Sequence, residues 1–440
     1  MKKPYLLFCI LFLIYWSCED TKEEEEEPHY TFVKTFGSNG GDIGRSVQQT
    51  ADGGYIITGK AGCGVDGGGV WLLKTNSQGI EEWSNLLTNA YGCNNGDGEG
   101  RWIQQTTDGG YVIVGTTFPD FYDEYYDYPR TILLIKTDSQ GQVEWKQNFG
   151  GIDYGLFDDS EGRFVQQTDD GGFILTGYTY STKNHTNDVW LIKTDANGNE
   201  EWNRTLGDSI YFQWNAGGDE EPMPYALYDY GSSVQQTSDG GYIIGGYSTG
   251  WCFDSDWRIT CKSNVLLIKT NSRGNREWLK SFGENKAWEF HRGHSVQITP
   301  DGGYIIAGER AIGNEESNFW LIKTDSNGNQ IWDKTYGNGG ERGWSVQQTT
   351  DGGYVMTGQT GSMTNYWDWW LLKTDSNGNE MWDKTFGGIE QDYGGYCVQQ
   401  TTDGGYILTG QTYSFGNDQG SDLWLIKTDP EGNTVPYGEE

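Results

Sequence analysis

The chain has 440 residues, of which 35% are hydrophobic, and a formal net charge of −33 at pH 7. This charge argues against nucleic acid and anionic membranes as partners gathered by long-range attraction, and we expect no nucleic acid partner. The length alone would predict two or three domains. One repeated motif nevertheless runs from Tyr30 to about Pro436 without a change in composition, so we predict a single domain over residues 30–440.

Residues 1–18 predict a targeting segment. Two lysines precede the apolar run Leu6 to Trp16, and Cys18 follows shortly after. The pattern resembles a bacterial lipoprotein signal, in which the cysteine is lipidated and becomes the mature N-terminus. Tyr15 and Trp16 depart from the usual residues of that signal. The alternative is an uncleaved N-terminal anchor, although the run is short for a membrane span.

Residues 19–29 predict an extended acidic linker. Glu19, Asp20 and the run Glu23 to Glu27 repel one another and cannot build a core. Acidic residues directly after a lipidated cysteine resemble the surface-export signal of lipoproteins in Bacteroidetes-type bacteria. We therefore expect a monomer that a lipid anchor holds in the outer membrane, on the cell surface.

The rest of the chain consists of seven copies of one unit. Each copy contains Asp-Gly-Gly followed by Tyr or Phe, and the copies start 50 to 69 residues apart. The starting residues are Asp52, Asp108, Asp170, Asp239, Asp301, Asp351 and Asp403. Periods of this size, with several short strands in each copy, are typical of a propeller.

Each copy predicts four strands. In the sixth copy they are Ser345–Thr349, Tyr354–Gly358, Trp370–Thr374 and Met381–Phe386. All are short runs rich in Val, Ile, Thr and aromatic residues, bounded by Gly, Asn and Asp. Asp-Gly-Gly joins the first strand to the second, and a turn such as Asp-Ser-Asn-Gly joins the third to the fourth. The sequence therefore predicts an all-β, seven-bladed β-propeller with four-stranded blades.

The two ends of the repeat predict how the ring closes. The last copy ends after its third strand, Leu423–Thr428. The missing strand lies at the other end of the chain, where Phe32–Gly37 matches Trp382–Gly387 with Phe32 in the place of the tryptophan. We predict that Thr31–Phe36 completes the last blade, which leaves no unpaired edge.

The segments DGGYIITG, WLIKTDSNGN and WxKTFGG resemble those of secreted propeller-like repeat proteins of Bacteroidetes and archaea. The resemblance covers about Tyr30 to Pro436. The Asp-x-x-Gly-x-x-x-Trp portion is also similar to the tryptophan-docking repeat of quinoprotein-like propellers, with one residue fewer between aspartate and tryptophan. These resemblances imply a fold and a cell-surface setting, and no activity.

Residues that recur from copy to copy are interpreted as structural. Fourth-strand tryptophans are expected to pack between blades, the alternative being a platform for a ligand: Trp83, Trp145, Trp202, Trp278, Trp332 and Trp382. A function at one site would not need seven copies of a lysine, and the third strands carry Lys74, Lys136, Lys193, Lys269, Lys323, Lys373 and Lys427.

The cysteines after the linker predict structural roles. Cys252 and Cys261 fall in one loop and can close it as a disulfide, and Cys63 and Cys93, in loops flanking the outer strands of the first complete unit, are also predicted to be disulfide residues. Cys397 stands where other copies have serine, and we interpret it as a small buried residue. No paired Cys/His spacing occurs, so neither a metal nor a cofactor is expected.

Variation in length is confined to the second-to-third loops and the connections between units, which share one face of a propeller. Their long members are aromatic and acidic: residues 118–128, 209–214, 225–230 and 251–257. Function usually lies in variable loops that a rigid scaffold holds. The alternative interpretation is a plain solvated rim.

One position of the first strand varies from copy to copy directly after an invariant glycine. Every copy has glycine three residues before the apolar residue of this strand, and the next position holds Arg45, Arg101, Arg163, Ser232, His294, Trp344 or Tyr396. We predict that these seven residues ring the mouth of the central channel. Arginine binds carboxylate or sulfate through paired hydrogen bonds. The alternative pairs each arginine with a neighbouring acid, such as Asp42, Glu99 or Glu161.

Two functions follow from this ring. The leading hypothesis is a non-catalytic surface lipoprotein that binds a glycan or an envelope protein through Arg45, Arg101, Arg163, His294, Trp344 and Tyr396. The rival is a polysaccharide lyase or hydrolase acting on an anionic polysaccharide, with His294, Tyr396 and Arg163 as candidate catalytic residues. These residue types resemble the site of propeller-type polysaccharide lyases. His291 and His294 alone are too few for a metal.

Overall fold

The computed structural model describes residues 30–37, 40–64, 67–88, 98–117, 130–150, 159–181, 186–207, 227–250, 262–283, 289–312, 316–361, 366–416 and 420–436. This part of the chain holds 28 strands, and no helix in it is long and apolar enough to cross a membrane.

The strands follow one another as the repeat predicts. Their bounds are β1 Phe32–Phe36; β2 Ile43–Gln49, β3 Tyr55–Gly64, β4 Gly67–Thr75, β5 Glu81–Leu86; β6 Glu99–Gln105, β7 Tyr111–Thr117, β8 Thr131–Thr137, β9 Val143–Phe149; β10 Ser160–Gln167, β11 Phe173–Ser181, β12 Thr186–Thr194, β13 Glu200–Leu206; β14 Leu227–Gln236, β15 Tyr242–Gly250, β16 Lys262–Thr270, β17 Arg276–Phe282; β18 Glu289–Ile298, β19 Tyr304–Ile312, β20 Asn318–Thr324, β21 Gln330–Tyr336; β22 Arg342–Gln348, β23 Tyr354–Thr360, β24 Asp368–Thr374, β25 Glu380–Phe386; β26 Cys397–Gln400, β27 Tyr406–Thr412 and β28 Asp422–Thr428.

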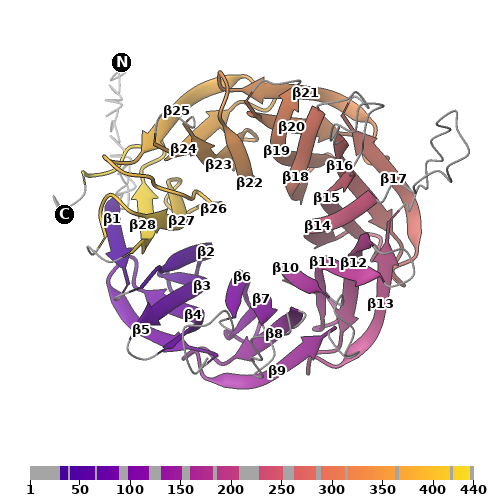
Figure 1. Ribbon diagram of the computed structural model, residues 1–440, viewed down its shortest axis with the longest axis horizontal. Helices are drawn as coiled ribbons and strands as arrows, with labels where there is room; N and C mark the ends of the chain where they lie inside the picture. Colours follow the sequence, from indigo (N-terminus) through magenta and orange to yellow (C-terminus); the bar gives the residue numbers. More distant parts are fainter. Residues whose placement is uncertain are drawn as a thin grey trace, which may run out of the picture.

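These strands form seven four-stranded antiparallel blades around a central axis, which confirms the predicted seven-bladed β-propeller (Figure 1). The first strand of each copy is innermost and the fourth is outermost. The fourth and fifth blades are also joined by one parallel pair, Lys262 with Glu289. The first strands therefore surround the axis, where residues from all seven copies meet.

The ring closes as predicted, through the N-terminal strand. β1 pairs antiparallel with β28, from Phe32 opposite Lys427 to Phe36 opposite Leu423. The ring of Phe32 meets Tyr55 of the first blade at 5.9 Å, just as Trp83 meets Tyr111 at 6.2 Å one blade further on. Phe32 thus takes over the role of a fourth-strand tryptophan at the seam.

The fourth-strand tryptophans pack between blades, as interpreted. Trp83 covers Gly141 in the third-to-fourth turn of the next blade, where an added Cβ would lie 2.5 Å from the indole. Gly141 also has φ +72°, a conformation that favours glycine. The same contact recurs between Trp145 and Gly198 and between Trp382 and Gly432. Each turn glycine is therefore needed both for its backbone and for the tryptophan of its neighbour.

The third-strand lysines are structural too. Lys323 is buried, and its Nζ lies 2.8 Å from Asp301 and donates to the carbonyl of Thr324 at 2.9 Å. Asp301 also accepts the N–H of Gly303 at 3.0 Å, and an added Cβ on this glycine would lie 2.7 Å from Nζ. The lysine–aspartate pair recurs in all seven blades at 2.8–3.0 Å. It explains why the Asp-Gly-Gly turn recurs without change.

A belt of glutamines joins the innermost strands, which the sequence analysis did not anticipate. Gln48 accepts the backbone N–H of Gln105 from the next blade at 2.6 Å. The equivalent side chains of the other blades do the same, and the seven bonds of 2.5–3.0 Å close a circle. The belt fixes the spacing of the first strands and so the width of the channel.

Candidate functional site

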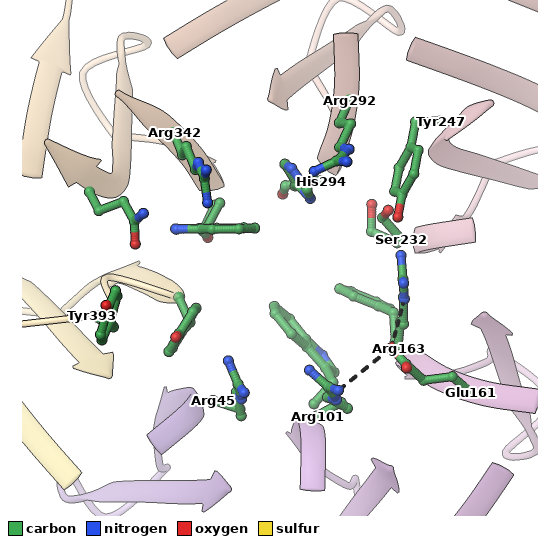
Figure 2. A pocket seen from close by; sticks show the side chains of 18 of the residues that line it. Arg45, Arg101, Glu161, Arg163, Ser232, Tyr247, Arg292, His294, Arg342 and Tyr393 are labelled. Atoms are coloured by element: carbon green, nitrogen blue, oxygen red, sulfur yellow. Dashed lines mark hydrogen bonds and ion pairs between the residues drawn. The ribbon is translucent and has the colours of Figure 1, made fainter. Parts of the chain in front are cut away.

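A cavity of about 680 Å³ occupies the mouth of the central channel (Figure 2). The structure brings all seven variable first-strand residues to its lining: Arg45, Arg101, Arg163, Ser232, His294, Trp344 and Tyr396. Trp367 and Tyr393 line it as well, and they come from a second-to-third loop and a connection between blades. The cavity therefore lies toward the face that carries these variable connections.

A β-bulge turns six of the seven variable residues toward the axis, all except Tyr396. In the first blade Gly44 pairs with Gly59 and Ser46 pairs with Thr58, so Arg45 between them has no partner in the ladder. The same shift occurs at the equivalent place in β6, β10, β14, β18 and β22. A Cβ on Gly59 would lie 1.8 Å from the carbonyl oxygen of Ile43, so the bulge needs glycine here. Bulges of this kind re-aim one side chain without ending the strand.

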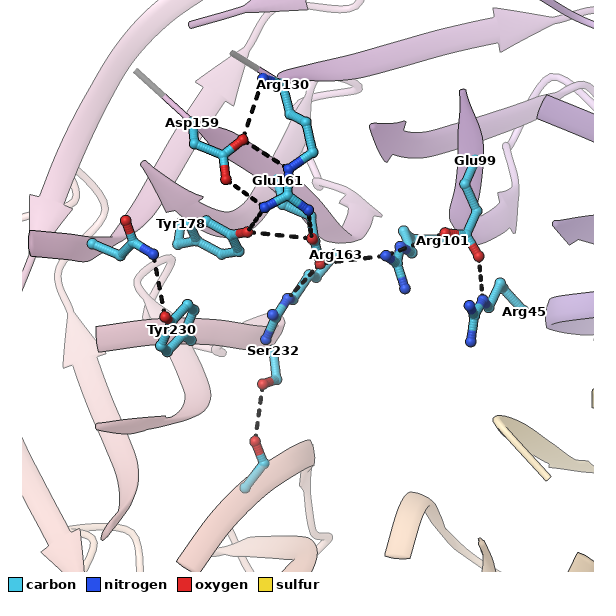
Figure 3. Close-up of polar contacts among 12 residues, drawn as sticks. Arg45, Glu99, Arg101, Arg130, Asp159, Glu161, Arg163, Tyr178, Tyr230 and Ser232 are labelled. Carbon is cyan, nitrogen blue, oxygen red and sulfur yellow. Dashed lines mark hydrogen bonds and ion pairs between the residues drawn. The ribbon is translucent and has the colours of Figure 1, made fainter. Parts of the chain in front are cut away.

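The first arginine cluster consists of Arg45, Arg101 and Arg163 with Glu99 and Glu161 (Figure 3). Arg45 pairs with Glu99, Arg101 lies 3.2 Å from Glu99 and 3.7 Å from Glu161, and Arg163 lies 3.0 Å from Glu161. The alternative prediction, that each arginine pairs with a neighbouring acid, therefore holds for Glu99 and Glu161. Three guanidiniums nevertheless share two carboxylates, which leaves a positive charge in the cluster.

Both glutamates of this cluster stay ionised. Burial by itself would raise the pKa of Glu161, but Arg163, Arg101 and Arg130 outweigh it and lower this pKa to about 2. Burial also opposes ionisation of Glu99, whose pKa is lowered by Arg45 and Arg101. Arg130 braces Glu161 at 3.0 Å and donates to the hydroxyl of Tyr178 at 2.7 Å. The carboxylates thus hold the guanidiniums in fixed positions.

The second arginine cluster consists of Arg292, Arg342 and Glu309, with His294 beside them. The carboxylate of Glu309 lies 3.2 Å from a side-chain nitrogen of Arg292, 3.6 Å from one of Arg342 and 3.9 Å from one of His294. Figure 2 shows Arg292, Arg342 and His294 across the cavity from Arg45 and Arg101. Arg292 and Arg342 were not among the predicted site residues, because they precede the first-strand glycine whereas the predicted ring follows it. The signal was an arginine directly before this glycine in two copies, at Arg292 and Arg342.

Aromatic rings form the floor and one side of the cavity. Trp102 and Phe164 are stacked, with centroids 4.2 Å apart, and line both this cavity and a deeper one of about 160 Å³. The ring centroid of Trp344 lies 4.6 Å from that of His294 and 5.9 Å from that of Tyr396. The sequence analysis also missed Trp102 and Phe164. The signal was a bulky ring in two copies where the other five have serine or cysteine.

The candidate catalytic residues line one cavity without forming a compact group. Arg163 comes from the third blade and lies 5.3–5.8 Å from the rings of Tyr178, Tyr230 and Tyr247. Tyr396 comes from the last blade and lies under Arg45 at 4.3 Å. His294 comes from the fifth blade, and burial lowers its pKa although Glu309 opposes this. The imidazole is therefore neutral at neutral pH.

Several predicted features lie outside the described residues. They are Cys18, Cys93, Cys252, Cys261, and the loop segments 118–128, 209–214, 225–226 and 251–257. Cys63 falls within β3, but its side chain is not described. Cys397 is buried, and burial raises the pKa of its thiol to about 11. In the described part of the chain, no group of three His, Cys, Asp or Glu side chains could hold a metal ion.

The fold and the cavity together define a class of protein: a seven-bladed β-propeller with an arginine-rich axial cavity. The chain is similar to the BP39L lectin from Burkholderia pseudomallei, with 9% identity, coverage of 90% of this chain and 97% of the lectin, and a TM-score of 0.46. It is similar to an α-L-arabinanase from Penicillium chrysogenum, with 12% identity, coverage of 74% of this chain and 92% of the arabinanase, and a TM-score of 0.41. It is also similar to a protein of unknown function from Dyadobacter fermentans, with 11% identity, coverage of 74% of this chain and 92% of that protein, and a TM-score of 0.46.

No protein-family model and no curated protein matches the chain. TM-scores of 0.41–0.46 carry no argument about function. Any functional conclusion therefore depends on the cavity itself.

Proposed function

We propose that this protein is a non-catalytic binding protein of the cell surface, whose axial cavity takes an acidic saccharide. The observation that carries the proposal is the charge of the cavity. Five arginines line it, whereas three carboxylates contact them, in a chain whose net charge is −33. Guanidinium groups bind carboxylate and sulfate through charge-assisted hydrogen bonds.

The shape and lining favour a glycan over an envelope protein. A cavity of about 680 Å³ matches the ~300–1,000 Å³ of small-ligand sites, whereas a stable protein interface needs ~1,200–2,000 Å² of buried surface. The stacked rings of Trp102 and Phe164 offer an apolar floor to the face of a sugar ring. The Nε of Arg101 and Nε1 of Trp344 are buried without a hydrogen-bond acceptor among the described residues. Such donors are rare unless water or a ligand completes them.

The location is part of the same proposal. The signal-like residues 1–18, with Cys18 as the lipidation site, and the acidic linker 19–29 support a lipid-anchored protein on the outer face of an outer membrane.

A polysaccharide lyase is the second candidate, and His294 is the observation that favours it. Its neutral imidazole lines the same cavity as Arg163 and Tyr396, which are the residue types needed to abstract a proton beside a uronate carboxylate. A hydrolase fits less well, because it needs a protonated carboxyl group as acid. The pKa values of Glu99, Glu161 and Glu309 are all lowered by arginines or His294, although burial opposes this.

The test is a glycan array followed by titration calorimetry on the double variant Arg45→Ala/Arg163→Ala. Arg101 remains in contact with Glu99 and Glu161, so neither buried carboxylate loses its last partner. We expect the wild-type protein to bind uronate- or sulfate-containing glycans. The double variant should lose about 1.5–3 kcal/mol for each contact removed, with little change in melting temperature.

The matched control is Arg273→Ala, an exposed arginine in a third-to-fourth turn, which should bind like the wild type. A double variant that melts earlier but binds unchanged would make the arginines purely structural. Release of an unsaturated oligosaccharide by the wild type would replace the binding proposal with the lyase.

A further inference from the structure

The two arginine clusters share one design. The first has three guanidiniums on two carboxylates, and the second has two guanidiniums on one carboxylate. Each cluster therefore has one arginine more than it has carboxylates. Since both line the same cavity, a ligand that satisfies only one of them leaves the excess charge of the other without a counterion.

The second cluster is held by the same kinds of contact as the first. Burial by itself would raise the pKa of Glu309, but its contact with His294 and the charges of Arg292 and Arg342 lower it to about 2. Arg292 also lies over Tyr247 at 5.6 Å, and Arg342 over Trp367 at 5.3 Å. Guanidiniums held in this way lose little freedom when a ligand binds, which favours affinity.

The clusters differ in depth and lie apart. The side chains of Arg292 and Arg342 are 44% and 43% exposed, whereas those of Arg45, Arg101 and Arg163 are 19–29% exposed. Figure 2 shows Arg342 and Arg292 on one side of the cavity and Arg45 and Arg101 on the other. The Trp102–Phe164 floor lines the same cavity.

We propose that the cavity recognises a saccharide with at least two acidic groups, one bound by each arginine cluster, with a sugar ring over the aromatic floor. This rests on the proposed function, and it names the ligand class of the same site. The ligand is an oligosaccharide of uronate or sulfated residues. A sugar with a single acidic group engages only one cluster and binds more weakly.

The experiment uses titration calorimetry with trisaccharides of galacturonic acid in three forms: all carboxylates free, one free and the others methyl-esterified, and all esterified. A sulfated trisaccharide set with the same three levels of charge is run beside it. The proteins are the wild type, Arg163→Gln for the first cluster, Arg342→Gln for the second, and Arg273→Gln as the control. Melting temperatures confirm that each variant is folded.

We expect the wild type to bind the fully acidic form of one set at least about tenfold more tightly than the singly acidic form. Arg342→Gln and Arg163→Gln should each weaken binding of the fully acidic form by about tenfold, close to the singly acidic value. Arg273→Gln should behave like the wild type.

The two proposals fail differently. Equal affinity for singly and fully acidic forms, or a loss in Arg163→Gln without one in Arg342→Gln, overturns this inference and leaves the proposed function standing. A wild type that binds no acidic form of either set overturns the proposed function, and this inference with it.

Discussion

Lys427 shows how a buried charge is tolerated seven times in this chain. Its side chain is 2% exposed, and Nζ lies 2.8 Å from Asp403 and donates to the carbonyl of Thr428 at 2.7 Å. Burial lowers the pKa of this lysine, although Asp403 opposes the change. A buried ammonium group is acceptable only with such partners, because an unpaired one costs several kcal/mol.

Replacing this lysine tests its structural role. We expect Lys427→Met to destabilise the protein by about 1–3 kcal/mol, because a buried carbonyl loses its donor and Asp403 loses its cation. The measurement is thermal melting. Lys334→Met is the control, since Lys334 is exposed on the outermost strand β21, and equal melting of the two variants would contradict the role assigned to Lys427.

Asp368 is a carboxyl group whose ionisation opposes folding. Burial, and then the charge of Asp392 in the connection between β25 and β26, raises its pKa from 3.8 to about 6. Oδ1 has no hydrogen-bond partner among the described residues. Because the folded pKa exceeds the unfolded one, this group favours folding below about pH 4 and loses that contribution as the pH rises through about 6.

The variant Asp368→Asn should remove this pH dependence. The full shift corresponds to roughly 3 kcal/mol, and partial exposure of the group reduces the expected gain to about 1 kcal/mol at pH 7.5. At pH 4 the variant and the wild type should melt alike. Melting curves at both pH values check this, and an equal difference at both would show that ionisation is not the cause.

Among the strands, β1 is the one that closes the ring. It supplies the outer edge of the last blade, and its Phe32 is buried against Tyr55 of the first. No other blade takes a strand from the far end of the chain. The contacts of β1 therefore join the two ends of a 440-residue sequence.

A chain that starts at residue 38 should melt well below one that starts at residue 30, because the last blade loses an edge strand and its packing across the seam. Phe32→Ala alone should cost about 3–5 kcal/mol. A synthetic peptide of residues 30–37 should restore part of the lost stability. Identical melting of the two chains would show that the seam does not depend on β1.

At the scale of the whole propeller, the charge gathered at the axis has the opposite sign to the net charge of the chain. The net charge is −33, yet arginines from five of the seven blades meet around the axis. Asp and Glu number 63 in the whole sequence, whereas Lys and Arg number 30. The cavity is the concentrated exception, and a low-dielectric wall strengthens its field toward an anion.

The sequence by itself determined the number of blades, the strands within each blade, and the closure of the ring. These depend on local signals, namely alternating strands, Asp-Gly-Gly turns and the match between Phe32–Gly37 and Trp382–Gly387. It also placed the seven variable residues together, because equivalent positions of a ring surround one axis. The lysines and tryptophans could be interpreted as structural because they recur.

Only the tertiary structure decided which charges meet. Arg101 contacts Glu161 of the next blade, and Arg342 contacts Glu309 of the previous one. Such pairs join residues far apart in the sequence, and they depend on the bulge that turns Arg101 inward and on the way neighbouring blades pack against each other. Neither is encoded in the repeat itself, so the excess of arginine over carboxylate in each cluster could be counted only after the ring was assembled.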